Sequence, residues 1–337
     1  MTKLSFFKIL KKDTPIKLIY FVEDPNFGDM LNVDLFSKYT NKTVINTDKN
    51  KADIVAIGSL LHVLLNKKNK KLKNKKPLIV YGTGFIEKNR LNDFFIRPLD
   101  VRAVRGFRTL DRLRKCENVA ISPNVAVGDP ALLIPKIFDV SSIKKKYKLG
   151  IIPHYLDRDN PLLQKIIIKN SVIIDVSENT YDFVKKVAEC ESIISSAMHG
   201  LICADSLLIP NIRMILSDKI TGGDYKFDDY YSAFGIKCHN KVDLNLQEFT
   251  EKDLEFTINN YKLDKNKLTE IQTNLLSQFP YDLNTCTLKE CQDFTDKQVK
   301  ENKLSFGFKK QHARELFKKH KKTNIFQYWF YRLTKKI

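Results

Sequence analysis

Residues 187–214 constrain the fold most strongly, because they predict a strand, a helix and a second strand in immediate succession. The short apolar run at 193–194 predicts a buried strand, and the two serines that follow it are residues that cap helices. Apolar side chains then recur at helical spacing as far as Pro210, and the run at 212–216 begins the next strand. This order is the repeating unit of a parallel α/β sheet.

The predicted helix opens with His199 and Gly200. The first turn of a helix offers free backbone N–H groups and the positive end of the helix dipole, which favour a phosphate or a carboxylate. Imidazole titrates near neutral pH, so His199 suits proton transfer or phosphate binding. Ligands of parallel α/β sheets bind at the carboxyl ends of the strands, which makes both residues candidates for a site. The alternative is a buried, hydrogen-bonded core histidine.

Strand and helix patterns alternate along the rest of the chain. In the first part we predict strands at 16–22, 43–46, 52–57, 78–81 and 103–104, and helices over 30–39, up to 65, and up to 115. The segment 125–130 carries a Gly-Asp-Pro motif, which we interpret as shaping a turn between domains. After a boundary near 135–147 we predict strands at 149–153, 166–169 and 172–175, a helix capped by Asn179, and polar helices within 244–277. Such alternation predicts parallel, doubly wound sheets.

We therefore predict an α/β protein with two Rossmann-like, doubly wound domains that face each other across a cleft. The N-terminal domain is expected to span residues 1–140. The C-terminal domain, which carries the His-Gly pair, is expected to span residues 141–285. A basic, aromatic, helical tail is expected over residues 286–337.

The formal net charge of +19 indicates an anionic partner. From residue 300 onward, twelve basic residues stand against two acidic ones, so much of the excess lies in the tail. Aromatic residues alternate with basic ones over 303–337, a composition typical of contact with an anionic membrane surface; a basic helix packed on the first domain is the alternative. Nucleic acid is not expected as a partner, because the basic residues form no recognised reader motif.

The six cysteines form no C-x-x-C pair, and no cluster has the spacing of metal ligands, so no metal site is expected. The first dozen residues are basic without forming an export signal. No apolar run approaches the roughly 18 residues that span a bilayer. We therefore expect a cytoplasmic protein with reduced thiols, either free or peripheral on the inner face of the cytoplasmic membrane.

Residues 195–211 read S-S-A-M-H-G-L-I-C-A-D-S-L-L-I-P-N. This segment resembles the His-Gly signature of the polysaccharide pyruvyl transferase family, whose enzymes move the pyruvyl group of phosphoenolpyruvate onto a sugar of a surface polysaccharide. The resemblance also implies a GT-B-like arrangement of the two domains. Some members read Arg-Leu before the His-Gly pair, where this chain has Ala197 and Met198. This departure leaves open which cation holds the donor.

Further motifs extend the resemblance over about residues 25–231. Asn26, Gly28 and Asp29 match an Asn-x-Gly-Asp segment of the family, after the first predicted strand. The resemblance implies that Asn26 and Gly28 contact the substrate and that Asp29 acts as a base on a sugar hydroxyl. On the residues alone, a turn in which Asp29 is the helix N-cap is equally compatible.

Three small residues directly follow the predicted strand at 78–81, namely Gly82, Thr83 and Gly84. Small residues there let backbone N–H groups approach a ligand. Arginine is the natural bidentate partner of carboxylate and phosphate, and Arg105 matches a family arginine in this part of the chain; surface charge is the alternative. His154 matches a Pro-His or Gly-His position at the first strand of the second domain.

The resemblance predicts a phosphoenolpyruvate-dependent transferase of capsule, exopolysaccharide or lipopolysaccharide biosynthesis that needs no cofactor. It assigns His199 as acid or phosphate ligand, Asp29 as base, and Arg105 to donor binding. Ser195 and Ser196, read mainly as helix caps, also hold phosphate oxygens in this interpretation. The acceptor is a sugar, and a lipid-linked one fits the basic, aromatic tail. The alternative function is a GT-B glycosyltransferase that uses a nucleotide sugar.

Overall fold

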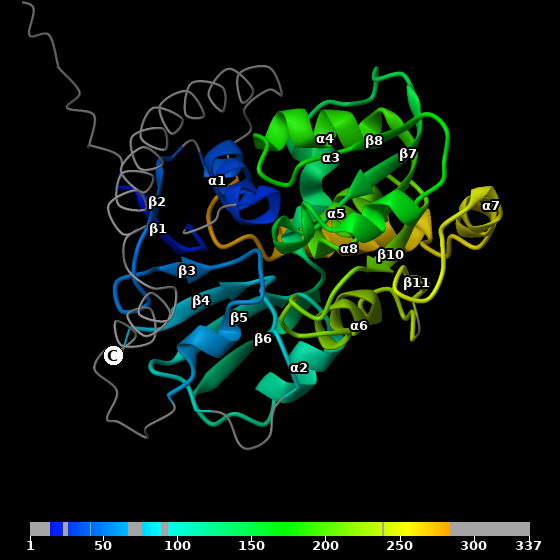
Figure 1. The fold of residues 1–337 in the computed structure, drawn as a ribbon. Coiled ribbons are helices and arrows are strands. Elements are labelled where there is room, and N and C mark those ends of the chain that lie inside the picture. Colours follow the sequence, from blue (N-terminus) through cyan, green and yellow to red (C-terminus); the bar gives the residue numbers. More distant parts are fainter. Residues whose placement is uncertain are drawn as a thin grey trace, which may run out of the picture. The chain divides into compact units, whose positions relative to one another are not determined.

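The computed structural model describes residues 14–22, 26–40, 42–66, 76–88, 94–237 and 239–283. The predicted tail over 286–337, and with it the predicted membrane contact of 303–337, lies outside these residues. The described part of the chain contains two parallel sheets with helices packed against them, which confirms the predicted α/β class (Figure 1).

The first sheet is parallel throughout and has the strand order β2-β1-β3-β4-β5-β6. Its strands are β1 (Ile16–Ile19), β2 (Val44–Asn46), β3 (Ile54–Val55), β4 (Leu78–Tyr81), β5 (Leu99–Val104) and β6 (Val119–Val127). β5 begins at Leu99, earlier than the strand predicted at 103–104. The prediction was too short because Asp100 and Arg102 interrupt the apolar run. These two side chains lie on one face of the strand and pair with each other at 3.1 Å.

Helices and short turns connect these strands. They are α1 (Phe27–Thr40), η1 (Leu61–Leu64), α2 (Phe107–Leu113), η2 (Pro130–Leu133) and α3 (Ile134–Ile137), where η marks a 3₁₀ turn. The helix predicted to end at residue 65 is the single 3₁₀ turn η1. Its leucines, Leu61 and Leu64, are buried, so the apolar pattern reflects packing rather than a longer helix.

The second sheet is also parallel, in the order β11-β10-β9-β7-β8. Its strands are β7 (Tyr147–Ile152), β8 (Ser171–Ile173), β9 (Cys190–Ser195), β10 (Asn211–Ile215) and β11 (Lys241–Asp243). The strand predicted at 166–169 is wrong. This segment follows the turn η4 (Pro161–Lys165), with Ile166 and Ile168 in the hydrophobic cluster of the sheet, Ile167 exposed, and a single bridge between Ile166 and Phe249.

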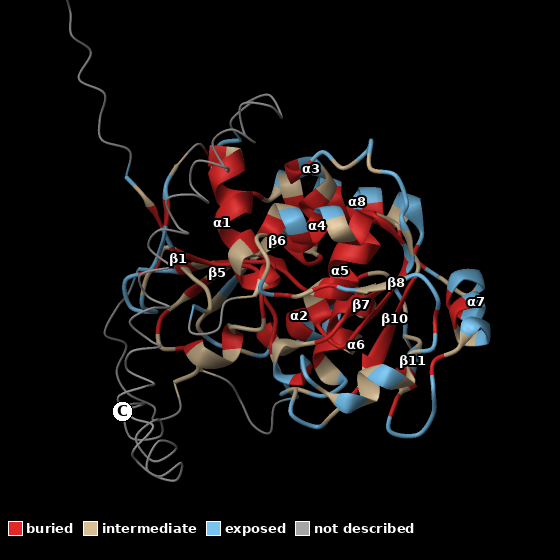
Figure 2. Ribbon diagram, turned by 45° about the horizontal axis from the view of Figure 1, so that its top comes forward, coloured by how far each residue is buried: buried red, intermediate tan, exposed pale blue. Residues whose placement is uncertain are grey.

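The second half contributes the turn η3 (Tyr155–Asp157) and the helices α4 (Thr180–Ala188), α5 (Met198–Ser206), α6 (Tyr225–Ser232), α7 (Glu251–Asn259) and α8 (Lys265–Ser277). Asn179 Oδ1 accepts a hydrogen bond from Asp182 N at 2.9 Å, which confirms the predicted cap of α4. The polar helices predicted within 244–277 are α7 and α8, and α7 is largely exposed (Figure 2).

One hydrophobic cluster is shared by helices that follow strands of both sheets. Phe27 of α1 stacks on Phe183 of α4 with ring centroids 4.1 Å apart, and Phe27 N donates to Val176 O at 2.7 Å. The remaining sheet faces pack on separate clusters, so central strands such as β3, β4, β9 and β10 are largely buried, while the edge strands β2, β6, β8 and β11 are partly exposed (Figure 2). The cleft and the domain boundary near residue 140 stay predictions.

Candidate active site

The helix that carries His199 begins directly beyond β9. Its N-cap is Ala197, which makes no side-chain cap, so the prediction that Ser195 or Ser196 caps this helix is wrong. Ser195 Oγ instead accepts from Ala197 N at 3.0 Å and lies within hydrogen-bond distance of Ile152 O and Ala197 O. This fully buried serine therefore fixes the turn between β9 and α5.

Two glycines let the helix and its histidine approach neighbouring elements. A Cβ on Gly28 would lie 2.0 Å from His199 Nδ1, so the imidazole packs directly on the backbone of α1. A Cβ on Gly200 would lie 2.5 Å from Ser195 Oγ, so α5 sits close to the end of β9. The structure thus brings Gly28, His199 and Gly200 together, as the predicted site requires.

Asp29 lies in the first turn of α1, within electrostatic reach of His199. Asn26 organises this turn, because its Oδ1 accepts from Gly28 N at 3.0 Å and its Nδ2 donates to Asp29 Oδ2 at 2.6 Å. Asp29 is therefore not the helix N-cap. Burial raises the pKa of Asp29 to about 6, although the charge of His199 and the hydrogen bonds from Asn26 lower it.

A second carboxyl group, Asp129, faces His199 from just beyond β6. Asp129 Oδ2 lies 3.8 Å from His199 Nε2, and neither atom has a hydrogen-bond partner among the described residues. The other oxygen, Oδ1, accepts from Ala131 N at 2.9 Å, so the buried carboxyl group is held in place. A shift of less than 1 Å would join the two as a charge-assisted hydrogen bond.

Sequence reasoning missed Asp129 as a site residue, because its Gly-Asp-Pro motif is also typical of a turn. The available signal was its position just after the apolar run at 125–127, in the same kind of place as His199 after the run at 193–194.

The Gly82-Thr83-Gly84 segment makes contacts within the first sheet. Gly82 N donates to Ala103 O at 2.7 Å, and Gly84 N donates to Gly58 O at 3.1 Å. The buried Thr83 hydroxyl donates to Gly58 O at 2.7 Å. The backbone N–H groups that suggested ligand binding at both glycines therefore already have partners, and substrate contact by these residues stays a prediction.

Arg105 is fully buried, and its guanidinium group binds other parts of the protein. Its Nε pairs with Asp229 Oδ2 of α6 at 2.9 Å, while its two terminal nitrogens donate to Ser59 Oγ and Phe85 O, each at 2.6 Å. Thr109 Oγ1 also donates to Asp229. Arg105 thus anchors α6 to the end of β5, and its predicted contact with the donor stays a prediction.

His154 follows β7 and lies beside the start of α5, because its N donates to Ser196 Oγ at 2.8 Å. Its Nδ1 accepts from Leu156 N at 3.3 Å, and its ring packs on Tyr155 with centroids 4.3 Å apart. Burial and the charge of Lys226 lower the pKa of His154 to about 4. This imidazole is therefore neutral at neutral pH. Sequence reasoning gave Lys226 only minor weight.

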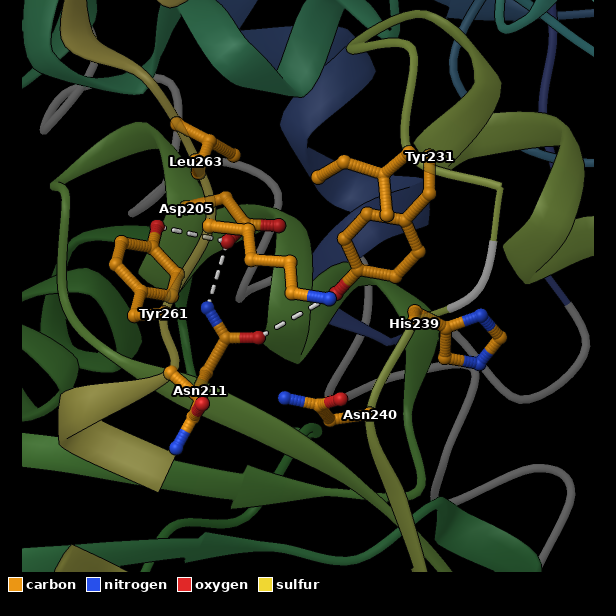
Figure 3. A pocket seen from close by; sticks show the side chains of 10 residues that line it. Asp205, Asn211, Tyr231, His239, Asn240, Tyr261 and Leu263 are labelled. Carbon is orange, nitrogen blue, oxygen red and sulfur yellow. Dashed lines mark hydrogen bonds between the residues drawn. The ribbon is translucent and has the colours of Figure 1, made fainter. Parts of the chain in front are cut away.

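A pocket at the opposite end of α5 is distinct from this site (Figure 3). It lies around Asp205 and Asn211, the first residue of β10, and therefore near the amino ends of the strands. The buried Asp205 accepts hydrogen bonds from Asn211 Nδ2 at 2.6 Å and from Tyr230 OH and Tyr261 OH at 2.9 Å. These bonds satisfy the carboxyl group internally, so we assign the network to stability.

Within the ranges that the structure describes, no helix is long and apolar enough to cross a membrane. No group of three or more His, Cys, Asp or Glu residues is arranged to hold a metal ion in the same ranges.

Two parallel sheets, with histidines and carboxyl groups gathered beyond their strand ends, define an α/β protein of the class that binds ligands at this edge. A sequence model described as polysaccharide pyruvyl transferase matches residues 4–218, well over half of the chain. The protein belongs to the polysaccharide pyruvyl transferase family, as its His-Gly motif predicted.

Individual relatives are distant. Uncharacterized protein L143 of Acanthamoeba polyphaga mimivirus is 29% identical over 232 residues, which cover 66% of this chain and 75% of L143. Succinoglycan biosynthesis protein ExoV of Rhizobium meliloti (strain 1021) is 26% identical over 220 residues, which cover 63% of this chain and 62% of ExoV. The chain thus spans less than two thirds of the length of ExoV.

Among solved structures, the uncharacterized protein KP1_0663 of Klebsiella pneumoniae has a TM-score of 0.35 and 15% identity, over 64% of this chain and 87% of that one. This TM-score is too low to support a conclusion about the fold.

Proposed function

We propose that the protein transfers the pyruvyl group of phosphoenolpyruvate to two hydroxyl groups of a sugar, forming a pyruvate ketal in polysaccharide biosynthesis. Family membership supports the reaction class, and the name of ExoV, a succinoglycan biosynthesis protein, supports a polysaccharide acceptor. The observation that carries the proposal is the position of His199. It packs on Gly28, lies 3.8 Å from Asp129, and is electrostatically coupled to Asp29.

In this mechanism His199 donates a proton to the methylene carbon of phosphoenolpyruvate, which leaves C2 electron-poor. Asp129 orients the imidazole and stabilises its charged form. A sugar hydroxyl attacks C2 and passes its proton to Asp29. With a pKa of about 6, this carboxyl group is largely ionised at neutral pH and basic enough to accept the proton. The C2–O bond to phosphate then breaks, and Asp29 passes its proton to the departing phosphate. The second hydroxyl attacks C2 to close the ketal, and its proton returns to His199 through solvent, so both side chains are restored.

The donor is tested by thermal unfolding of the full chain with phosphoenolpyruvate or uridine diphosphate. A ligand that binds only the folded state at 100 times its dissociation constant stabilises it by about 2.7 kcal/mol. We expect stabilisation by phosphoenolpyruvate and none by uridine diphosphate. The reverse result would replace this proposal by the alternative, a glycosyltransferase that uses a nucleotide sugar.

The role of His199 is tested by His199→Ala in a pyruvyl transfer assay. Loss of the proton donor should lower kcat by about 10²-fold or more. The variant's unfolding temperature without ligand, compared with that of the wild type, controls for misfolding. Activity close to wild type in a folded variant would remove His199 from the mechanism.

A lipid-linked acceptor and a place on the inner face of the cytoplasmic membrane belong to the same proposal. Their support is the basic, aromatic composition of residues 303–337. Capsule, exopolysaccharide and lipopolysaccharide remain the candidate products.

A further inference from the structure

Lys226 is a buried cation without a counter-ion in the described structure. It lies in the first turn of α6 and is only 9% exposed. Its Nζ lies 5.4 Å from the centroid of the Phe227 ring, and no carboxylate or hydrogen-bond acceptor of the described residues is paired with it. Nζ is not one of the fully buried polar atoms, so the ammonium group keeps some access to solvent and can be reached by an anionic ligand.

The carboxylates closest to Lys226 in sequence are already bonded to other cations. Asp224 pairs with Arg213 and Lys241, Asp228 with Arg108, and Asp229 with Arg105. These pairings leave Lys226 without a carboxylate of its own among the described residues, so its charge is available to the phosphate group of a ligand.

Helix α6 lies at the same edge of the sheets as the candidate site, because its Asp229 pairs with Arg105 just beyond β5, the strand beside β6 and the following Asp129. Burial and the charges of Arg105 and Arg213 lower the pKa of Lys226 to about 8, so its ammonium group is still charged at neutral pH. Lys226 in turn lowers the pKa of His154, whose backbone N is bonded to Ser196. Ser196 directly precedes the N-cap of α5, so the free N–H groups of that helix lie in the same region.

We propose that Lys226 binds the phosphate group of the donor, beside the N-terminus of α5. The inference rests on the proposed function for the identity of the donor and extends it by naming the residue and the group that it binds.

The test is isothermal titration of the full chain with inorganic phosphate, phosphoenolpyruvate and pyruvate. We expect Lys226→Gln to weaken binding of phosphate and phosphoenolpyruvate by about tenfold or more, while pyruvate binding is unchanged. Lys219→Gln, which removes the same charge from an exposed loop, is the matched control and should bind as wild type does. Equal weakening in both variants, or undiminished phosphate binding in Lys226→Gln, would overturn the inference. A loss of pyruvate binding would also overturn it, because it would assign Lys226 to the carboxylate.

A second readout separates a binding role from a structural one. Without ligand, Lys226→Gln should unfold at the same temperature as wild type or a higher one, because it removes a charge that no carboxylate of the described residues pairs with. A clearly lower temperature would identify Lys226 as a structural cation.

The proposed site and the proposed function can fail separately. If phosphate binds through Lys226 but phosphoenolpyruvate does not bind, the proposed donor fails and the phosphate site stands. If Lys226→Gln turns over phosphoenolpyruvate normally, the site fails and the proposed function stands.

Discussion

A side chain at position 28 and the imidazole of His199 would occupy the same space, which is why position 28 is a glycine. The imidazole lies where a Cβ on α1 would stand, 2.0 Å from the ideal Cβ position. Contacts below 3.0 Å do not occur for real Cβ atoms, so one of the two groups has to move when a side chain is added. Gly28 is thus a packing requirement of the histidine, whether or not it also contacts a substrate.

Gly28→Ala is therefore expected to displace the imidazole and to lower kcat by about 10²-fold, close to the effect of His199→Ala. Alanine is the better helix former, so the loss should not come from unfolding of α1. The double variant Gly28→Ala, His199→Ala provides the control. If Gly28 acts through His199, the double variant is no slower than His199→Ala alone. A further loss of kcat in the double variant would show that Gly28 has an independent role.

Helix α6 joins the second half of the chain to the first through buried polar contacts. Asp229 accepts from Arg105 Nε at 2.9 Å and from Thr109 Oγ1 at 2.8 Å, and Ser232 Oγ accepts from Phe107 N at 2.8 Å. Both partners of the ion pair are fully buried. The pair holds the helix that carries Lys226 at the end of β5.

Asp229→Ala should lower the free energy of unfolding by about 3–5 kcal/mol, because it leaves the buried Arg105 guanidinium without its counter-ion. Urea unfolding monitored by circular dichroism measures the change. Glu270→Ala, which breaks the exposed pair with Lys267 on α8, is the matched control and should change it by less than about 1 kcal/mol. Similar losses in both variants would contradict the structural role of the Arg105–Asp229 pair.

Sequence reasoning located most strands and helices, because apolar runs and helical periodicity are local signals. It also proposed His199, Gly28 and Asp29 from contiguous motifs, and the structure brings these residues together. It did not predict that Arg105 binds Asp229, because the two residues are 124 positions apart and their pairing depends on tertiary packing. The cap of α5 was mispredicted for a related reason, since Ser195 bonds to the β7 carbonyl Ile152 O, which sequence proximity does not reveal.

Across the whole molecule, helices of both halves contribute to one hydrophobic cluster. A cluster shared in this way couples the stabilities of the two sheets, because neither half can lose its helices without exposing apolar surface of the other. Asp205, in the last turn of α5, is fully buried and accepts hydrogen bonds from Tyr230, Tyr261 and Asn211. Burial raises its pKa from 3.8 to about 6.

A raised pKa in the folded state means that the folded protein binds the proton more tightly than the unfolded chain. The contribution of Asp205 to stability is therefore greatest below about pH 4 and falls as the pH rises through 6. The free energy of unfolding of Asp205→Asn minus that of wild type should therefore increase by on the order of 3 kcal/mol from pH 4 to pH 7. Asp29 titrates in the same direction in both proteins, so its effect cancels in the comparison. Urea unfolding at the two pH values measures the difference, and an equal difference at both would refute the assignment.

The candidate site draws Gly28, Asp129 and His199 from three separate stretches of the chain. During synthesis the ribosome releases Gly28 and Asp129 well before His199 and the strand that follows it. A growing chain thus carries Asp29 and Asp129 long before it has His199, the residue that they flank. Under the proposed mechanism it has no proton donor until α5 has been made, so a message truncated before α5 is expected to yield no active fragment.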